Sequence, residues 1–337
     1  MRTPRGATAA ALTLVAALAA AALAAAAPPP ALPRLNIEPG GITVSGLSAG
    51  GYMATQLELS HSALLRGAGI FAAGPWFCAR GSLIRSLAEC LGRDTSEPAA
   101  GELVAAARRA AASGAIDPPA KLAAHRVWML RGSHDDQVAR PVADALAEFY
   151  RAFVPAANFR YVTDVPVAHG VPTRTSGGSC GTTAAPYINA CGYDGVGEML
   201  AFLTGVPLAP PVRADAGPQR FDQRRYDTAG SLALNGYLYL PAACAHGAPC
   251  RLHVALHGCR QGADFVGEAF VRDAGYNGWA EANRIVVLYP QVAASWLAPV
   301  NPQGCWDWWG YTGPDYATRN AVQVRALRAM LAALSGA

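Results

Sequence analysis

Short apolar runs alternate with longer helix-prone segments along the first two thirds of the chain. The apolar runs have the character of buried strands and lie at residues 42–44, 69–73, 126–130 and 159–165. Segments of helical character follow them at residues 50–59, 83–112, 142–153 and 195–203. This alternation predicts an α/β fold with a mostly parallel central sheet and helices on both faces.

The last third of the chain differs in its composition and in its pattern of apolar runs. Proline, alanine and glycine dominate near residues 205–220, which predicts a linker or a long loop. The dipeptide Asn235-Gly236 is a strong hairpin signal inside one of the later apolar runs. These runs predict strands at residues 221–226, 232–240, 252–256 and 285–289, and a helix at residues 321–334. They either form a second domain or complete the first sheet.

The N-terminal residues have the pattern of a secretory signal peptide. Arg2 and Arg5 precede an alanine- and leucine-rich stretch at residues 9–27, with Ala-x-Ala cleavage sites near its end. A membrane anchor is the alternative, but alanine is only weakly apolar and no positively charged flank follows. We therefore predict a signal peptide at residues 1–27, one mature domain at residues 28–337, and an exported protein without stable membrane insertion.

The eight cysteines fit an oxidising compartment, where disulfides persist. Spacing alone does not fix their connectivity, and pairing sequence neighbours is the simplest reading. The neighbours are Cys78 and Cys90, Cys180 and Cys191, Cys244 and Cys250, and Cys259 and Cys305. Metal binding is disfavoured because no Cys-x-x-Cys motif is present and the surroundings of His253 and Cys259 lack zinc spacing. The net charge of +4 is spread without a Lys/Arg cluster, so no nucleic-acid partner is expected.

Residues 46–50 read Gly-Leu-Ser-Ala-Gly and lie between a strand-like and a helix-like run. A Gly-x-Ser-x-Gly pattern in this context predicts a nucleophile elbow, whose small residues allow the sharp turn that exposes the serine. Ser48 is then the candidate nucleophile, and the Ala49 amide can donate to a developing oxyanion. The pattern also arises by chance in chains rich in glycine and alanine, and this chain is one.

A serine hydroxyl needs a base, and the base needs a carboxylate to hold its tautomer. The strand at residues 126–130 leads into a loop with Asp135 and Asp136, of which Asp135 fits the position of the acid better. A solvated loop carboxylate or a helix cap is the ordinary alternative for either residue. His169 lies in a Gly/Pro loop after the next strand and is the candidate base. Five other histidines lack such a position: His61, His125, His134, His246 and His253.

A His-Gly loop after a strand supplies the second oxyanion amide in α/β-hydrolases, normally upstream of the nucleophile. Here the segment His257-Gly258-Cys259 lies far downstream of Ser48. This order predicts that the usual early strands are displaced to the C-terminal part, which favours one circularly permuted sheet over two domains. Cys259 and Ala49 would supply the two amides. A turn in an unrelated C-terminal domain is the alternative.

These residues resemble the poly(3-hydroxybutyrate) depolymerases whose α/β-hydrolase domain is circularly permuted. The similar motifs cover nearly the whole mature chain in the family's order, and they are Gly-Leu-Ser48-Ala-Gly-Gly-Tyr-Met, Gly-Ser-His-Asp135-x-x-Val, His169-x-x-Pro-Thr, His257-Gly-Cys259 and Gly-Cys305-Trp-Asp-Trp-Trp. The resemblance implies Ser48 as nucleophile, Asp135 as orienting acid, His169 as base and the Cys259 amide as oxyanion donor. It also implies that Cys259 is bridged to Cys305, which would clamp the oxyanion loop to a tryptophan-rich loop. No cofactor is needed.

Polyester chains are uncharged and weakly hydrogen-bonding, so aromatic and aliphatic surface should recognise them. Four aromatic residues share one loop and are candidates for lining the cleft, namely Trp306, Trp308, Trp309 and Tyr311. Burial in the core is the ordinary alternative for each tryptophan. Many secreted family members carry a separate polymer-binding module, whereas this chain stops after one terminal helix and is expected to be of the single-domain kind.

The resulting hypothesis is a secreted, monomeric serine esterase acting on poly(3-hydroxybutyrate) or on related short-chain polyhydroxyalkanoate esters. A feruloyl or acetyl esterase, or a broad carboxylesterase, would use the same chemistry on other esters. A serine peptidase would need an anchor for a charged group, and none is evident. A non-catalytic polymer-binding protein is disfavoured by the intact spacing of Ser48, Asp135 and His169.

Overall fold

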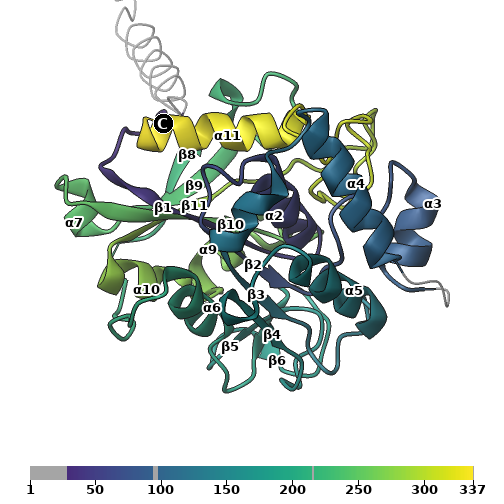
Figure 1. Cartoon of the computed structure of the whole chain (residues 1–337). Coiled ribbons are helices and arrows are strands. Elements are labelled where there is room, and N and C mark those ends of the chain that lie inside the picture. Colours follow the sequence, from purple (N-terminus) through teal and green to yellow (C-terminus); the bar gives the residue numbers. More distant parts are fainter. Residues whose placement is uncertain (1–28, 94–97, 215, 337) are drawn as a thin grey trace, which may run out of the picture.

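The computed structural model describes residues 29–93, 98–214 and 216–336 (Figure 1). An eight-stranded sheet runs through it in the order β4-β3-β2-β1-β10-β11-β9-β8. The strands are β1 (Ile37–Leu47), β2 (Gly67–Phe71), β3 (Arg126–Leu130), β4 (Phe159–Val162), β8 (Gln219–Asp222), β9 (Asn235–Tyr239), β10 (Cys250–Leu256) and β11 (Ile285–Tyr289). The six strands from β4 to β11 are parallel, and β9 and β8 add an antiparallel edge.

Side chains alternate between two apolar layers along each central strand, because successive strand residues point to opposite faces. In β3, Val127 and Met129 join one core cluster, whereas Trp128 and Leu130 join the other. The first layer is covered by α2 (Ala49–Ser60), α4 (Ala100–Ala112), α5 (Arg140–Arg151) and α11 (Val322–Ser335). The second is covered by α6 (Gly195–Thr204), α9 (Ala269–Asp273) and α10 (Tyr276–Asn283). The predicted parallel sheet with helices on both faces is confirmed.

The order of strands in the sheet differs from their order in the chain. The first strand, β1, lies at the centre and pairs with β2 on one side and with the late strand β10 on the other. Strands from both sides of the Pro/Ala-rich connection thus share one sheet, as circular permutation requires. Within the connection, residues 205–214 and 216–218 form no helix or strand.

Short elements complete the chain around this sheet. A small second sheet, in the order β5-β7-β6, consists of β5 (Val171–Thr173), β7 (Ile188–Ala190) and β6 (Gly178–Ser179). The segment predicted as a helix at residues 83–112 is divided into α3 (Leu83–Arg85), a π turn (Ser86–Cys90) and α4. Two further short helices are α7 (Ala242–Ala245) and α8 (Ala263–Val266), and 3₁₀ turns are formed by Pro119–Ala124, Ala156–Asn158 and Gln223–Arg225.

The hairpin predicted at Asn235-Gly236 is wrong. Both residues lie inside β9, where Gly236 pairs with Phe221 of the antiparallel strand β8. A Cβ atom at Gly236 would lie 2.5 Å from the Phe221 ring. The glycine therefore makes room for a neighbouring aromatic side chain instead of turning the chain.

All eight cysteines are paired, and the pairs are those of sequence neighbours: Cys78–Cys90, Cys180–Cys191, Cys244–Cys250 and Cys259–Cys305. The predicted signal peptide at residues 1–27 lies outside the described residues. In the described ranges, no helix combines the length and the apolar character that crossing a bilayer requires.

Candidate active site

The turn from β1 into α2 places Ser48 at the carboxyl edge of the sheet in a strained conformation. Its φ of 56° and ψ of −120° are unusual for a residue with a side chain. A Cβ atom at Gly46 would lie 2.2 Å from the carbonyl oxygen of Gly50, and one at Gly50 would lie 2.3 Å from the Leu256 carbonyl oxygen. Only glycine fits at either position, which is why the sequence places one on each side of the serine.

This turn also leaves Ser48 accessible and frees a backbone donor. Within residues 44–60, Ser48 is the one residue that is not buried. Its own amide donates to the Phe71 carbonyl at 2.9 Å. The next amide, that of Ala49, begins α2, where the first N–H groups have no intrahelical acceptor. Within the described chain the Ala49 amide has no other acceptor either.

Asp135 and His169 are joined at the same edge of the sheet. Both carboxylate oxygens of Asp135 accept from Nδ1 of His169, at 3.1 and 3.0 Å. Oδ1 also accepts the amides of Gln137 and Val138, at 2.9 and 3.0 Å. Burial alone would raise the pKa of Asp135, but the His169 charge and these hydrogen bonds outweigh it and hold the pKa below its usual value. The carboxylate therefore stays ionised and orients the imidazole.

The neighbouring Asp136 has a different place. Its exposed carboxylate accepts from the Thr183 hydroxyl at 2.6 Å, and that hydroxyl oxygen accepts the amide of His169 at 3.1 Å. Of the two candidate acids, the structure thus brings Asp135 into contact with the His169 ring. The remaining ring nitrogen, Nε2, has no hydrogen-bond partner among the described residues, and no hydrogen bond joins it to the Ser48 hydroxyl in this conformation. Such contacts are often long in the absence of substrate.

The loop after β10 lies beside Ser48. A Cβ atom on Gly258 would be 3.5 Å from Cβ of Ser48 and 3.4 Å from the Leu47 carbonyl oxygen. Like that of Ala49, the Cys259 amide has no acceptor anywhere in the described ranges. The structure therefore places Gly258, which precedes the unpaired Cys259 amide, beside the Ser48 turn, which precedes the unpaired Ala49 amide. An oxyanion site requires unpaired donors of this kind.

Comparisons with known proteins give a consistent answer. No protein-family model matches the chain. A poly(3-hydroxybutyrate) depolymerase of Delftia acidovorans is 40% identical over 305 residues, which are 89% of this chain and 60% of that protein. A polyhydroxybutyrate depolymerase of Talaromyces funiculosus is 36% identical over 311 residues, which are 88% of this chain and 90% of that protein. The chain belongs to the polyhydroxybutyrate depolymerase family. It spans about three fifths of the length of the Delftia relative.

Solved structures from the same family share the fold. A crystal structure of the depolymerase from Penicillium funiculosum matches with a TM-score of 0.85 at 33% identity, covering 91% of this chain and 99% of that chain. A depolymerase with a serine-to-alanine substitution, complexed with an R3HB trimer, matches equally well. Together with the strand order, these matches confirm the predicted α/β-hydrolase-like fold.

Two of the four aromatic residues predicted to line the cleft are core residues instead. Trp306 is fully buried and Trp308 is 7% exposed. Trp306 packs against the His257 ring at 5.8 Å between centroids, and Trp308 stacks on Tyr52 at 4.9 Å. Their place in the core corrects the prediction for these two. The loop has glycines on both sides, but Cys305 next to Trp306 is itself buried and bridged to Cys259.

Trp309 and Tyr311 are half-buried, so this depolymerase-family chain keeps them as candidates for substrate contact. The Tyr311 hydroxyl donates to the Cys305 carbonyl at 2.8 Å, which leaves the ring rather than the hydroxyl available. The two rings contact each other with centroids 4.8 Å apart.

The sequence reasoning missed a group of strongly exposed apolar residues that is linked to the oxyanion loop through Asn301 and Cys305. Trp296 is 81% exposed, Leu297 80% and Val300 56%. They form the tip of a loop closed by two backbone hydrogen bonds between Ser295 and Asn301. Asn301 in turn bonds the backbone of Cys305, whose disulfide reaches Cys259 in the oxyanion loop. A signal was present, because residues 285–306 contain no charged side chain.

A second serine–histidine contact lies inside the sheet and does not form part of this site. Nε2 of His253 is 2.7 Å from the Ser45 hydroxyl, and Nδ1 is 2.8 Å from that of Thr43. Ser45 and His253 are both fully buried, and burial lowers the pKa of His253 to about 3. Since no carboxylate of the described residues contacts this imidazole and the pair is buried away from substrate, it is a structural link between β1 and β10.

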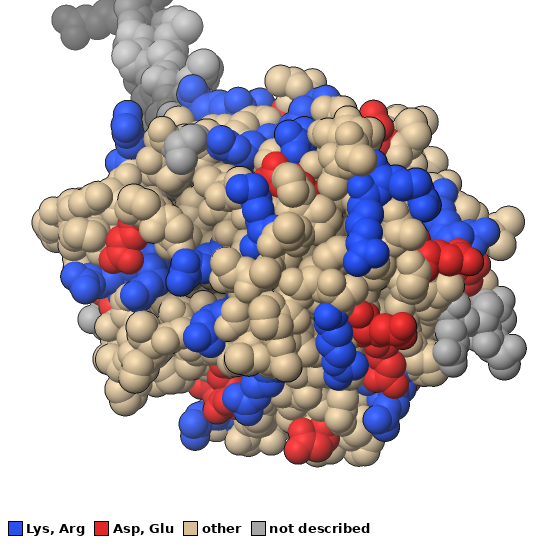
Figure 2. All heavy atoms as spheres, viewed as in Figure 1, with Lys and Arg blue, Asp and Glu red and all other residues tan. Residues whose placement is uncertain are grey.

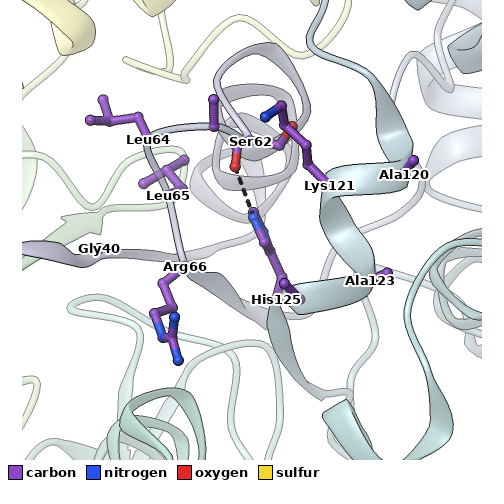
Figure 3. Close-up of a pocket in the computed structure, with 11 residues that line it drawn as sticks. Gly40, Ser62, Leu64, Leu65, Arg66, Ala120, Lys121, Ala123 and His125 are labelled. Carbon is purple, nitrogen blue, oxygen red and sulfur yellow. Dashed lines mark hydrogen bonds between the residues drawn. The ribbon is translucent and has the colours of Figure 1, made fainter.

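The cavity in Figure 3 lies at the opposite edge of the sheet, next to the amino ends of β1, β2 and β3. Its volume is about 380 Å³, and His125 lies in its wall. His125 donates to the Ser62 carbonyl and to the buried Glu58 carboxylate, each at 2.9 Å, and Tyr150 donates to the same carboxylate at 2.7 Å. This network joins α2 and α5 to the residue that precedes β3, far from Ser48.

Surface charge and possible metal ligands indicate no second site among the described residues. On the face in Figure 2, basic side chains are scattered over a largely neutral surface, with acidic groups beside several of them. Among the residues with described positions, no group of three or more His, Cys, Asp and Glu is placed to hold a metal ion.

Proposed function

We propose that the protein is a secreted serine esterase that hydrolyses poly(3-hydroxybutyrate) or related short-chain polyhydroxyalkanoate esters and oligomers. The observation that carries this proposal is the Asp135–His169 hydrogen bond at the sheet edge where the strained Ser48 emerges. Membership of the depolymerase family, and the R3HB trimer bound by a structural neighbour, support the choice of substrate.

In the first half-reaction, the Ser48 oxygen attacks the ester carbonyl while Nε2 of His169 takes the hydroxyl proton. Asp135 accepts from Nδ1 of His169, so it holds the reactive tautomer and stabilises the imidazolium that forms. The carbonyl oxygen becomes an oxyanion that the Ala49 and Cys259 amides stabilise. His169 then gives its proton to the departing alcohol oxygen as the ester C–O bond breaks, which leaves an acyl group on Ser48.

In the second half-reaction, His169 removes a proton from water, and the resulting hydroxide attacks the acyl carbonyl. The same two amides stabilise the second oxyanion, and the proton returns from His169 to the Ser48 oxygen as the acyl–oxygen bond breaks. A 3-hydroxy acid, or a shortened oligomer with a free carboxyl group, leaves. These steps use only side chains and backbone groups of the chain itself.

Recognition of an uncharged polyester would rest on apolar surface. The exposed tip at Trp296, Leu297 and Val300 and the half-buried ring of Trp309 supply it, and the tip is anchored to the loop that contains Cys259. A flat, hydrophobic solid can contact this projecting tip without burying a charged side chain of the tip. We assign to this tip the contact with the polymer chain outside the reacting ester.

The proposal includes export of the protein, which would act as a monomer. Four disulfides stabilise a chain that works in an oxidising compartment, and they would not persist in a reducing one. Secretion would also bring the esterase to a polymer too large to enter a cell.

The decisive test is the clearing of a poly(3-hydroxybutyrate) suspension by the wild type and by Ser48→Ala. We expect the rate to fall at least about a thousandfold, the scale seen when a triad member is removed. A fluorophosphonate probe should label Ser48 in the wild type. Clearing retained by Ser48→Ala would place the nucleophile elsewhere. Faster turnover of feruloyl esters than of hydroxybutyrate oligomers would support the serine esterase chemistry but contradict the proposed substrate.

A further inference from the structure

Both ends of Gly258, in the loop beside Ser48, are held by buried side chains that the mechanism above does not use. Nδ1 of His257 lies 2.8 Å from the Gly258 carbonyl oxygen. Oε1 of Gln261 accepts the Gly258 amide at 2.7 Å. His257 and Gln261 are both fully buried, so neither side chain can reach bulk solvent or substrate.

The partners of His257 define its protonation state. The Val292 amide donates to Nε2 at 3.1 Å, so that nitrogen carries no proton. Nδ1 must then carry the proton and donate it to the Gly258 carbonyl. Burial lowers the pKa of His257 to about 4, in agreement with a neutral ring. The imidazole is therefore a fixed donor to one carbonyl group.

The geometry of the peptide bond converts this contact into an orientation for the next amide. The C=O of Gly258 and the N–H of Cys259 belong to one planar trans peptide and point in opposite directions. Drawing the carbonyl toward His257 turns the Cys259 N–H away from that ring, and Gly258 lies against Ser48. Since Gln261 already occupies the Gly258 amide, the Cys259 amide is left as the donor of this segment.

Gln261 also links this peptide to the loop that follows His169. Its Nε2 donates to the Pro186 and Tyr187 carbonyls, each at 3.0 Å. The Tyr187 carbonyl also accepts the amide of Val171, two residues after His169. One side chain thus connects the segment of the expected oxyanion donor to the segment of the expected base.

We propose that His257 and Gln261 are positioning residues that set the Gly258–Cys259 peptide so that the Cys259 amide faces the oxyanion. The inference rests on the proposed function, because it assigns a cause to the orientation of one of its donors. Neither residue touches substrate. Their effect should therefore appear in the transition state, when charge develops on the carbonyl oxygen, and not in ground-state binding.

The test compares kcat and KM for a soluble p-nitrophenyl 3-hydroxybutyrate ester with those for the matching thiono ester, in which sulfur replaces the carbonyl oxygen. Sulfur is a weak acceptor, so the ratio of oxo- to thiono-ester rates reports the oxyanion contacts. His257→Phe keeps a ring but removes both hydrogen bonds. We expect kcat for the oxo ester to fall about 10- to 100-fold with KM nearly unchanged, and the rate ratio to fall at least about tenfold.

Matched variants separate positioning from general packing. His257→Asn can place an amide N–H near the position of Nδ1, so it should recover part of kcat and of the ratio. The exposed His246 ring contacts the Ala242 carbonyl on the short helix α7, and His246→Phe should leave both kcat and the rate ratio unchanged. Gln261→Leu should lower the rate ratio as His257→Phe does. If His257→Phe does not fold, the result for Gln261→Leu tests the positioning role by itself.

The outcomes distinguish this inference from the proposed function. A folded His257→Phe or Gln261→Leu with the wild-type ratio would overturn the positioning role while leaving the esterase intact. Equal loss of oxo- and thiono-ester rates would do the same, because it would indicate a general structural defect. Failure of the wild type to hydrolyse either ester would instead overturn the proposed function.

Discussion

Replacing Asp135 with asparagine changes one atom of the site and has a defined consequence. Oδ1 of Asp135 is held by the amides of Gln137 and Val138, so the asparagine carbonyl oxygen would take that position. The NH₂ group would then occupy the position of Oδ2, which lies 3.0 Å from Nδ1 of His169. A donor at that position forces Nδ1 to accept, and the imidazole proton moves to Nε2.

With its proton on Nε2, His169 cannot accept the Ser48 proton. The wrong tautomer in a serine triad of intact geometry lowers kcat by about 10⁴ in the known case. We expect a loss of about 10³ to 10⁴ here, which corresponds to roughly 4 to 5.5 kcal/mol of transition-state stabilisation. KM should change little, because Asp135 is buried and does not face the substrate.

Asp136→Asn is the matched control. The same substitution, one residue further along, removes charge from an exposed side chain that contacts the Thr183 hydroxyl and the side-chain amide of Gln137. Both variants are compared by steady-state hydrolysis of a soluble hydroxybutyrate oligomer, with circular dichroism to check folding. We expect Asp136→Asn to stay within about threefold of the wild type, because the loss of charge at an exposed, solvent-screened side chain costs little. If Asp135→Asn kept more than a tenth of kcat, or Asp136→Asn lost as much, the assignment of the acid would be wrong.

Three further predictions concern stability and the polymer. Replacing Cys259 and Cys305 together with serine opens a loop of sequence separation 46 and should lower the free energy of unfolding by about 4 kcal/mol, measured by urea titration; a loss below about 1 kcal/mol would contradict this. Burial lowers the pKa of His125, but the hydrogen bond and charge of Glu58 outweigh it, so the pKa lies above 6.5. The stability that the protonated His125–Glu58 pair gives to the fold is complete below pH 6.5 and is lost as pH rises through the raised pKa. Glu58→Gln should therefore lower the free energy of unfolding more at about pH 6 than at about pH 9; an equal loss at both pH values would refute this. Trp296→Ser should weaken adsorption of Ser48→Ala protein to a poly(3-hydroxybutyrate) film several-fold, and in the active background it should leave soluble-ester kcat unchanged; unchanged adsorption would remove the tip from substrate recognition.

Local patterns made the turn at Ser48 and the buried strands predictable from sequence. The two glycines around Ser48 are required by carbonyl groups 2.2 and 2.3 Å from where their Cβ atoms would lie, and that requirement is visible as a motif. The strand at Arg126–Leu130 was predicted with its observed bounds, because residues of a strand buried on both faces are apolar without interruption. The choice of Asp135 as the acid also agrees with the contact that the structure makes.

Features set by distant contacts were not predictable in the same way. Asn235-Gly236 has the composition of a turn, but the ring of Phe221 on the neighbouring strand determines why a glycine stands there. The burial of Trp306 depends on His257, and nothing close in sequence indicates that contact. Trp296 is exposed instead, and a single tryptophan between Ser295 and Leu297 gives no sign of whether it packs inward.

The parallel register explains why permutation leaves the site intact. Gly46 of β1 is paired with Leu256 of β10, and Ser48 and Gly258 each lie two residues beyond that pair, so neighbouring strands deliver them side by side. On the other side, β3 and β4 lie two and three strands from β1, or about 10 and 14 Å away at the usual strand spacing. The chain compensates with longer loops, since Asp135 lies five residues past the end of β3 and His169 seven past the end of β4. The position of each group is thus set by its strand's place in the sheet and by its loop length, and not by the order of strands in the chain. Lengthening the β4 loop by one residue before His169 should therefore impair hydrolysis far more than an insertion in the connection at residues 205–214, although the connection joins the two permuted parts; equal effects on kcat would argue against this account.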